Sequence, residues 1–103
     1  MKDTVKANIA IKIMPNSTDE DEIVRIVDEV IDYIKSTGLT YYVGPSETAI
    51  EGDDIRELME VAIKCHEVAI QAGTDGVSAY IKTDYKPGGS GLTIDKKLSK
   101  YRD

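Results

Sequence analysis

The stretch VKANIAIKI, residues 5–13, alternates apolar and polar side chains along its whole length. In an extended chain, Val5, Ala7, Ile9, Ile11 and Ile13 share one side, and Lys6, Asn8, Ala10 and Lys12 share the other. The alternation predicts a β-strand with one apolar face. VSAYIKT, residues 77–83, repeats the pattern near the other end of the chain and predicts a second such strand.

Two segments between these strands begin with helix-start signals. Ser17 and Thr18 precede the acidic run at 19–22, and Gly52-Asp53-Asp54 precedes the second segment. Gly38 and Gly73 follow the two segments, where helices commonly end. Apolar residues recur at spacings of three and four, which predicts two amphipathic helices. The expected stripes are Ile23, Ile26, Val27, Val30, Ile31 and Ile34 in the first, and Ile55, Leu58, Met59, Ala62, Ile63, His66, Ala69 and Ile70 in the second.

Residues 40–43 and 48–51 have the composition of two further strands, separated by a turn that begins with Gly44-Pro45. The order strand, helix, strand, strand, helix, strand predicts an α+β ferredoxin-like fold, βαββαβ. It has a four-stranded antiparallel sheet with two helices on one face. We expect a single domain over residues 1–103, with a Gly-rich loop and a short terminal helix following from about residue 85.

The predicted second face of the sheet has an unusual composition. It carries Asn8, Ala10, Lys12, Ser78, Tyr80 and Lys82. One interpretation is a solvated polar face. The other is a face buried by another subunit, in which the small side chains leave a ligand cavity.

Composition limits the classes of function. The chain has 13 lysines and arginines against 19 acids, for a net charge of −6, which argues against nucleic-acid binding. The locally basic C-terminal stretch favours a solvated tail over a nucleic-acid-binding arm. The chain has one cysteine, no signal-peptide pattern and no apolar run long enough for a membrane span. We therefore expect a cytoplasmic protein that does not bind membranes.

No pattern predicts a metal, cofactor or catalytic site. Cys65 and His66 are adjacent on a predicted helix, so they point in different directions, and the chain has no second Cys or His to complete a zinc site. The Gly-rich loop at 88–91 lacks the lysine of a phosphate loop, which leaves the hypothesis of a functional flap. Glu47 and Glu51 are a conceivable acid–base pair, but no nucleophile accompanies them. We expect no enzyme activity.

Glu51 and His66 each allow two interpretations. Glu51 is either an exposed acid near the start of the second helix or an acceptor for the amino or ring N–H of a ligand. His66 is either a core-edge residue bonded to backbone or a donor to a buried ligand. A buried carboxylate needs a partner, so we expect Glu51 to meet a ligand, His66 or a neighbouring chain.

The run GPSETAIEG at 44–52, with NIAI at 8–11, Met14-Pro15, GLTY at 38–41 and His66-Glu67, resembles the thiamine-binding family related to the YkoF-like proteins. The family was long described as an uncharacterised conserved protein family. The resemblance covers nearly the whole chain. Two departures stand out: Ser46-Glu47 replaces a frequent Met-Gly, and the Gly-rich loop replaces an acidic–basic run.

The resemblance implies binding of thiamine or its hydroxymethylpyrimidine moiety without known catalysis. It also implies self-association through the sheets into dimers or tetramers. Such a carrier, sensor or buffer would use Glu51 to accept the amino group of the pyrimidine, with Asn8 and Thr48 adding hydrogen bonds. Tyr42 or Tyr80 would stack on the ring, and His66 is a weaker candidate. The alternative function is a structural or regulatory oligomerisation domain without a ligand of its own.

Overall fold

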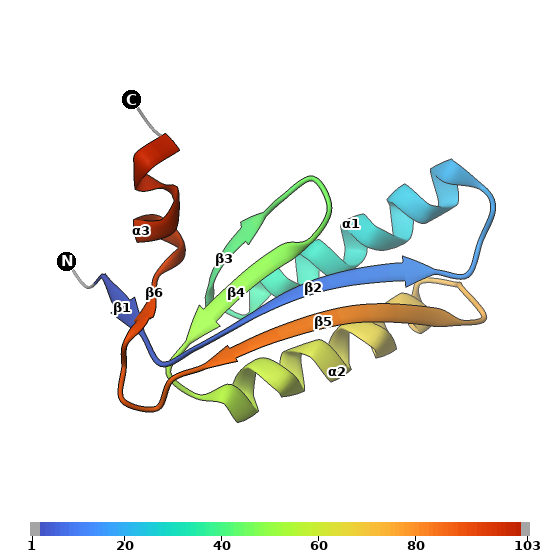
Figure 1. Cartoon of the computed structure of the whole chain (residues 1–103). Helices are drawn as coiled ribbons and strands as arrows, with labels where there is room; N and C mark the ends of the chain where they lie inside the picture. The colour runs from blue at the N-terminus through green and yellow to red at the C-terminus, as the bar shows by residue number, and fades with distance from the viewer. Residues whose placement is uncertain (1–2, 102–103) are drawn as a thin grey trace.

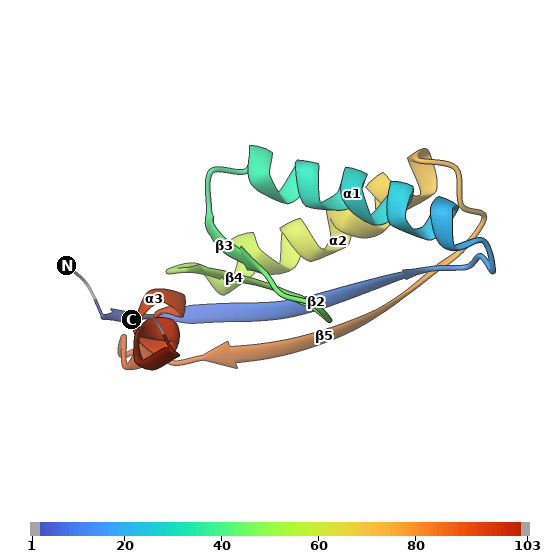
Figure 2. The ribbon, with the colours of Figure 1, turned by 90° about the horizontal axis from the view of Figure 1, so that it is seen from above.

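The computed structural model describes residues 3–101, without the side chain of Lys100. Its main sheet has four strands in the order β3-β4-β2-β5, and every neighbouring pair is antiparallel. The strands are β2 (Ala7–Pro15), β3 (Thr40–Val43), β4 (Thr48–Gly52) and β5 (Val77–Tyr85). Helices α1 (Glu20–Ser36) and α2 (Ile55–Gln71) cover one face of the sheet and leave the other face open (Figures 1 and 2). The predicted ferredoxin-like fold is confirmed.

Both helices begin at an aspartate. The Asp19 carboxylate accepts from the backbone N–H groups of Asp21 and Glu22, and the Asp54 carboxylate accepts from Arg56 N–H. Asp19 is therefore the N-cap, rather than the hydroxyl residues before it, because its carboxylate reaches the first unpaired N–H groups of the helix. Gly38 has a φ of +77°, a conformation that glycine adopts without a steric penalty.

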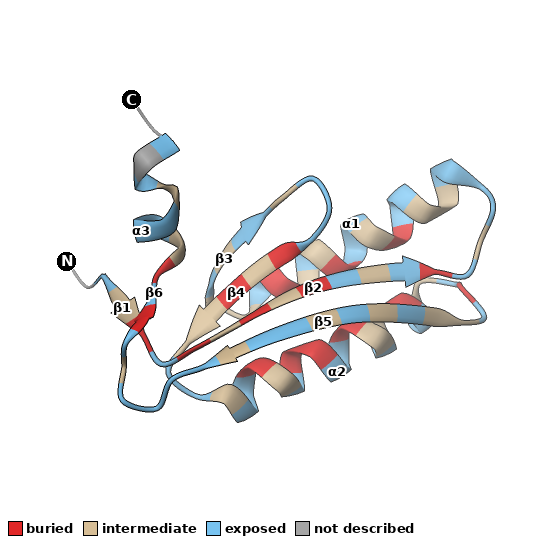
Figure 3. Cartoon of the chain, in the orientation of Figure 1, coloured by how far each residue is buried: buried red, intermediate tan, exposed pale blue. Residues whose placement is uncertain are grey.

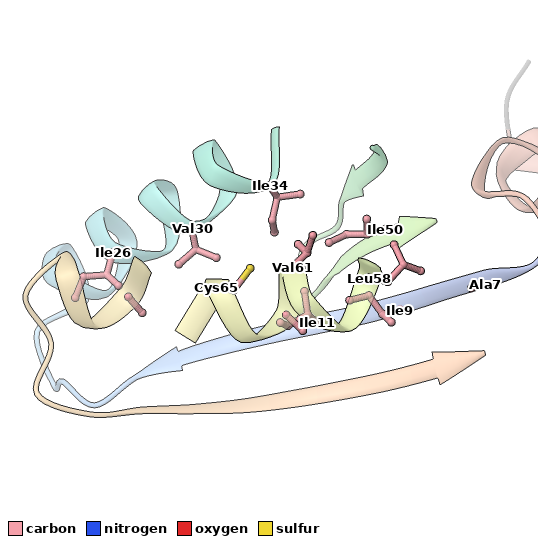
Figure 4. Packing of buried hydrophobic residues seen from close by; sticks show 12 residues of the cluster. Ala7, Ile9, Ile11, Ile26, Val30, Ile34, Ile50, Leu58, Val61 and Cys65 are labelled. Atoms are coloured by element: carbon pink, nitrogen blue, oxygen red, sulfur yellow. The ribbon is translucent and has the colours of Figure 1, made fainter. Parts of the chain in front are cut away.

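The core lies between the two helices and the sheet. Ile9 of β2 and Ile50 of β4 pair directly in the sheet and are fully buried. Figure 4 shows these side chains meeting those of α1 and α2. Burial alternates along the first half of β2, as the sequence pattern predicts (Figure 3). The strand needs this alternation because only one of its faces is covered by helices.

The predicted stripe of α2 is partly wrong. Ile63 and Ile70 keep 60% and 47% of their surface exposed, whereas Val61 and Cys65 are buried. The helix has apolar residues around more than half of its circumference, so periodicity alone does not define which arc faces the sheet. Leu58, Ala62 and Ala69 belong both to the predicted stripe and to the face that is buried, so they are buried as predicted.

The ends of the described chain form a separate two-stranded ribbon. Strand β1 (Thr4–Val5) pairs with β6 (Gly91–Leu92). Helix α3 (Ile94–Leu98) and a 3-10 turn at Ser99–Tyr101 follow; we call residues 91–101 the terminal arm. A side chain at Gly91 would meet the Val5 carbonyl oxygen at 2.7 Å, so the ribbon requires glycine there.

The terminal arm extends from the end of the sheet, beside the end of β4, rather than packing with the other helices (Figure 1). Residues 3–101 thus contain three α-helices, two on the sheet and the predicted short terminal one. The predicted strand at 5–13 is divided by Lys6 into β1 and β2, because Val5 turns away to pair with Gly91. No helix within residues 3–101 is long and apolar enough to cross a membrane.

Candidate functional site

A cleft of about 340 Å³ opens between α1, the second half of β2 and the turn that joins β3 to β4. Apolar side chains form most of its wall. They are Ile11, Ile13, Met14 and Pro15 from β2, Ile23, Val27, Val30, Ile31 and Ile34 from α1, and Val43 from β3. The polar residues of the lining are Lys12 of β2 and, at the other side, Ser46, Glu47 and Thr48. A largely apolar wall with a few polar groups is typical of small-molecule sites.

The turn at 44–47 has a fixed shape. Gly44 N–H donates to the Glu47 carbonyl oxygen at 2.9 Å and closes the turn. A β-carbon on Gly44 would lie 2.9 Å from that same oxygen, closer than such contacts occur in proteins. The turn therefore depends on Gly44, and it holds Ser46 and Glu47 at the edge of the cleft.

Thr48 is the buried polar residue of the cleft. It keeps 7% of its surface exposed and pairs with Ile11 in the sheet, which places both side chains on the helix-covered side. Its hydroxyl makes no hydrogen bond with another described residue of the chain. Among the described residues, no fully buried side-chain oxygen or nitrogen lacks a hydrogen-bond partner, so this unbonded hydroxyl is open to the cleft, where a ligand can contact it.

The other predicted site residues from the strands lie on the open face. Asn8 and Glu51 pair directly across β2 and β4, and the Asn8 amide donates to Asp84 Oδ2 at 3.4 Å. Tyr42 is on β3 and Tyr80 is on β5, at opposite edges of the sheet. Three strand spacings of about 4.8 Å separate these strands, so the two tyrosines cannot stack on one ring.

The predicted set therefore does not form one site. Thr48 and Glu51 are three residues apart in one strand, so their side chains point to opposite faces of the sheet. The sheet also separates Glu51 from His66, which lies on α2. His66 Nδ1 donates to the Ala62 carbonyl oxygen at 2.7 Å, within its own helix. The arrangement matches the interpretation of His66 as a core-edge residue bonded to backbone.

Glu51 has a partner that the sequence did not indicate. Its Oε1 accepts from Ile94 N–H at 2.5 Å, at the start of α3. Of the expected partners, His66 is not in contact with it, since the His66 ring bonds to the Ala62 carbonyl oxygen. The carboxylate is only half-buried, and it lies near a helix start as a cap would.

Among the groups whose pKa values are changed by their surroundings are Asp84 and Cys65. The Lys86 ammonium, which donates to Asp84 at 2.8 Å, lowers the pKa of that carboxyl, and the Asn8 amide contributes less. Burial raises the pKa of the Cys65 thiol to about 12, which leaves it unreactive at neutral pH. Neither group lies in the cleft. Among residues 3–101, no three His, Cys, Asp or Glu side chains are grouped so as to hold a metal ion.

Glu47 and the apolar residues of α1 line the cleft, but the sequence does not predict them as site residues. Its pattern indicates Glu47 only as a conceivable acid–base partner of Glu51, and the α1 residues only as core. The available signal was the alternation within TAIEG at 48–52, which separates Thr48 from Glu51 and places Thr48 on the side of the helix-facing Ile50.

Comparison with known proteins gives matches over most of the chain. The model of a family described as thiamine-binding protein matches residues 9–102. A UPF0045 protein of Clostridium perfringens is 42% identical over 95 residues, which cover 92% of this chain and 96% of the relative. A UPF0045 protein of Methanothermobacter thermautotrophicus is 29% identical over 72 residues, which cover 70% of this chain and 73% of the relative.

Solved structures share the fold over nearly the whole chain. A domain of unknown function, DUF77, from Bacillus cereus superposes with a TM-score of 0.82 at 31% identity, covering 97% of this chain and 93% of the other. A Thermotoga maritima protein provisionally assigned to thiamine biosynthesis or salvage superposes with a TM-score of 0.81 at 33% identity, covering 94% and 99%.

Proposed function

This chain belongs to the thiamine-binding protein family, and we propose that it binds thiamine or its hydroxymethylpyrimidine moiety in the cleft beneath α1. The ligand would be held without chemical change, so that the protein acts as a cytoplasmic carrier, sensor or buffer. No histidine or cysteine is among the described residues that line the cleft, which leaves no Cys–His or Ser–His pair there for nucleophilic catalysis.

The observation that carries the proposal is the Thr48 hydroxyl. A hydroxyl both donates and accepts, so it can pair with a ring nitrogen or with the amino group of an aminopyrimidine. The surrounding isoleucines and valines suit the flat faces of the ring. A volume of about 340 Å³ is at the small end of ligand sites, which favours a small heterocycle over a larger cofactor.

Glu47 adds a charge to this site. Glu47 is among the residues that line the cleft, next to Thr48 and on an exposed turn. Thiamine carries a permanent positive charge on its thiazolium ring, whereas hydroxymethylpyrimidine is neutral. A carboxylate at the edge of the cleft therefore favours the complete vitamin, because opposite charges attract more strongly where water is partly displaced.

Isothermal titration calorimetry of ligand-stripped protein with thiamine, and then with hydroxymethylpyrimidine, tests the proposal. We expect saturable binding in the micromolar range or tighter. Thr48→Val keeps the shape of the side chain and removes the hydroxyl, so we expect both ligands to bind about tenfold more weakly, or about 1.4 kcal/mol. Thr40→Val, on the open face of the neighbouring strand β3 and outside the cleft, is the matched control and should leave the affinity unchanged.

A folded protein that gives no heat with either ligand would favour the oligomerisation domain as the function. Asn8, Glu51, Tyr42 and Tyr80 remain proposed contacts on the open face. Glu51→Gln separates the two placements of the ligand: a tenfold loss with Glu51→Gln and none with Thr48→Val would move the ligand from the cleft to the open face.

A further inference from the structure

Strand β2 continues past one of the two strands that pair with it. Strand β5 pairs with the whole of β2, from Ala7 to Pro15, whereas β4 pairs with it only as far as Ile11, which lies opposite Thr48. The β3–β4 hairpin turns back at that point, so β2 extends beyond it (Figure 1). One edge of residues 12–15 therefore has no neighbouring strand among the described residues.

The cleft beneath α1 runs along this free edge of β2. Residues 11–15 all line it, without the alternation that a cleft over one face of the sheet would show. The turn at 44–47 forms the opposite wall. Backbone groups that point outward from the free edge therefore point into the cleft.

The hydrogen-bond pattern shows which backbone groups these are. Lys86 N–H donates to the Lys6 carbonyl oxygen at 2.7 Å, directly after β5. Because antiparallel ladders alternate, the even-numbered residues of β2 bond to β5 and the odd-numbered ones direct both N–H and C=O to the other side. Ile11 meets Thr48 of β4 on that side. Ile13 is the next such residue, and its N–H and C=O have no hydrogen-bond partner among the described residues.

Ile13 offers a single donor–acceptor pair. Pro15, the next odd-numbered residue, has no N–H, and its carbonyl oxygen accepts from Ser17 N–H at 2.9 Å. An extended peptide that added to this edge would need several such pairs in succession. One N–H beside one C=O instead suits a small ligand that carries an acceptor next to a donor.

We infer that the backbone of Ile13 recognises the aminopyrimidine edge of the ligand, an inference that rests on the proposed function. The N–H donates to the ring nitrogen next to the amino group, and the carbonyl oxygen accepts from the amino group itself. The ligand takes the place that a residue of β4 would have opposite Ile13. An aminopyrimidine has its acceptor and its donor side by side, as the N–H and C=O of one strand residue require.

Thr48 and Ile13 contact the ligand at neighbouring positions. Thr48 pairs with Ile11, two residues before Ile13, so about 7 Å separates the two positions along the strand. One six-membered ring with a hydrogen bond at each side covers such a distance. A hydroxyl rotates to donate or to accept, whereas the N–H and C=O of Ile13 are fixed. The backbone of Ile13 therefore determines the order of donor and acceptor that a ligand must present.

A thiamine analogue with an oxo group in place of the amino group, oxythiamine, tests this order. Its ring N–H and carbonyl oxygen reverse the pattern of donor and acceptor, while its shape and thiazolium charge are nearly the same. Calorimetry with the unmodified chain should show oxythiamine binding at least about tenfold more weakly than thiamine, because like groups meet at Ile13. Equal affinities would overturn the inference and leave the proposed function intact.

Amide hydrogen exchange followed by NMR locates the contact. In the free chain, the N–H of Ile13 should exchange faster than those of Ile11 and Met14, which bond to β4 and β5. Saturating thiamine should slow exchange at Ile13 at least about tenfold relative to these two residues. Thiamine binding without this selective protection would show that the ligand contacts other groups, and the inference would be wrong.

A proline at position 13 removes the N–H without removing a bond to β4 or β5. Ile13→Val is the matched control, since it keeps the N–H and has a side chain near the size of proline. We expect Ile13→Pro to bind thiamine at least about tenfold more weakly than Ile13→Val, with circular dichroism as a check on folding. Equal affinities of the two folded variants would count against Ile13.

If Ile13→Pro does not fold, exchange at Ile13 in the unmodified chain decides. A folded, unmodified chain that does not bind thiamine would overturn the proposed function and the role of Ile13 together. Binding that neither protects Ile13 nor discriminates against oxythiamine would overturn the role of Ile13 alone.

Discussion

The side chain of Glu51 and the backbone of Ile94 are joined by a hydrogen bond of 2.5 Å, between residues 43 positions apart. The bond connects the end of β4 to the first turn of α3. Two neighbouring bonds support it: Thr93 N–H donates to the Asp3 carbonyl oxygen at 3.0 Å, and Lys96 N–H donates to the Thr93 hydroxyl at 3.1 Å. The terminal arm is therefore attached to the sheet and to the ribbon by polar contacts.

Removing the Glu51 carboxylate should loosen the arm. A hydrogen bond to a charged group contributes about 1.5–3 kcal/mol, and half-exposure places Glu51 toward the lower value. For Glu51→Ala we expect a loss of about 1–2 kcal/mol in urea unfolding and faster amide hydrogen exchange over residues 91–98. Glu47→Ala, in the same hairpin but without this contact, is the control. Unchanged exchange in the arm would contradict the structural role of Glu51.

Neutralising Glu47 should change ligand preference rather than general affinity. Glu47→Gln keeps the size of the side chain and removes its charge beside the cleft. We expect thiamine to bind several-fold more weakly and hydroxymethylpyrimidine to bind as before, because only thiamine is a cation. Calorimetry with both ligands at low and moderate salt measures the difference. An equal loss for both ligands would show that Glu47 acts through the shape of the turn.

The centre of the core should dominate stability. Ile50 is fully buried against Ile9, whereas Val24 on α1 keeps 58% of its surface exposed. Truncating a buried isoleucine to alanine costs about 2–5 kcal/mol, through lost burial and the cavity left behind. We expect Ile50→Ala to fall in that range in urea unfolding, and Val24→Ala to change stability by less than about 0.5 kcal/mol. Similar values for both would be inconsistent with the described core.

Acid stability should depend on Asp84. The Lys86 hydrogen bond makes its pKa lower in the folded chain than in the unfolded one. Its stabilising contribution is therefore complete above the ordinary aspartate pKa and is lost as the pH falls through the lowered folded value. Lys86→Met should raise the pKa of Asp84, measured by NMR titration, whereas Lys64→Met on α2 should leave it unchanged. A pKa unmoved by Lys86→Met would exclude the ion pair as the cause.

The fold could be predicted because its elements carry local signals. Each signal predicts the element in which it occurs, without reference to distant residues. The signals are the alternation in β2 and in β5, the acidic starts of both helices, and Gly38 after α1. The ribbon of β1 and β6 has two residues in each strand, too few for any periodicity, and it depends on a pairing across the whole chain. Which part of the wide apolar surface of α2 becomes buried likewise depends on where α1 and the sheet lie.

The site was harder to predict than the fold. The sequence predicts Thr48 as a site residue together with Asn8 and Glu51, because all three side chains can form hydrogen bonds with a ligand. In the structure Thr48 lies on one face of the sheet and the other two lie on the opposite face. Alternation within β4 was enough to separate Thr48 from Glu51. The cleft itself could not be predicted, since its wall combines α1 with a turn, and a sequence does not give the gap between them.

The position of β2 has a consequence for how the chain is made. This strand, near the start of the chain, lies between β4 and β5 in the sheet. During synthesis, its partner β5 leaves the ribosome some seventy residues later, at about 5–20 residues per second. For several seconds, the backbone N–H and C=O groups of β2 that bond to β5 therefore have no strand partner, although the strand is rich in isoleucine. Folding must be completed by a long-range pairing, which predicts slow formation of the sheet and a nascent chain that benefits from chaperones.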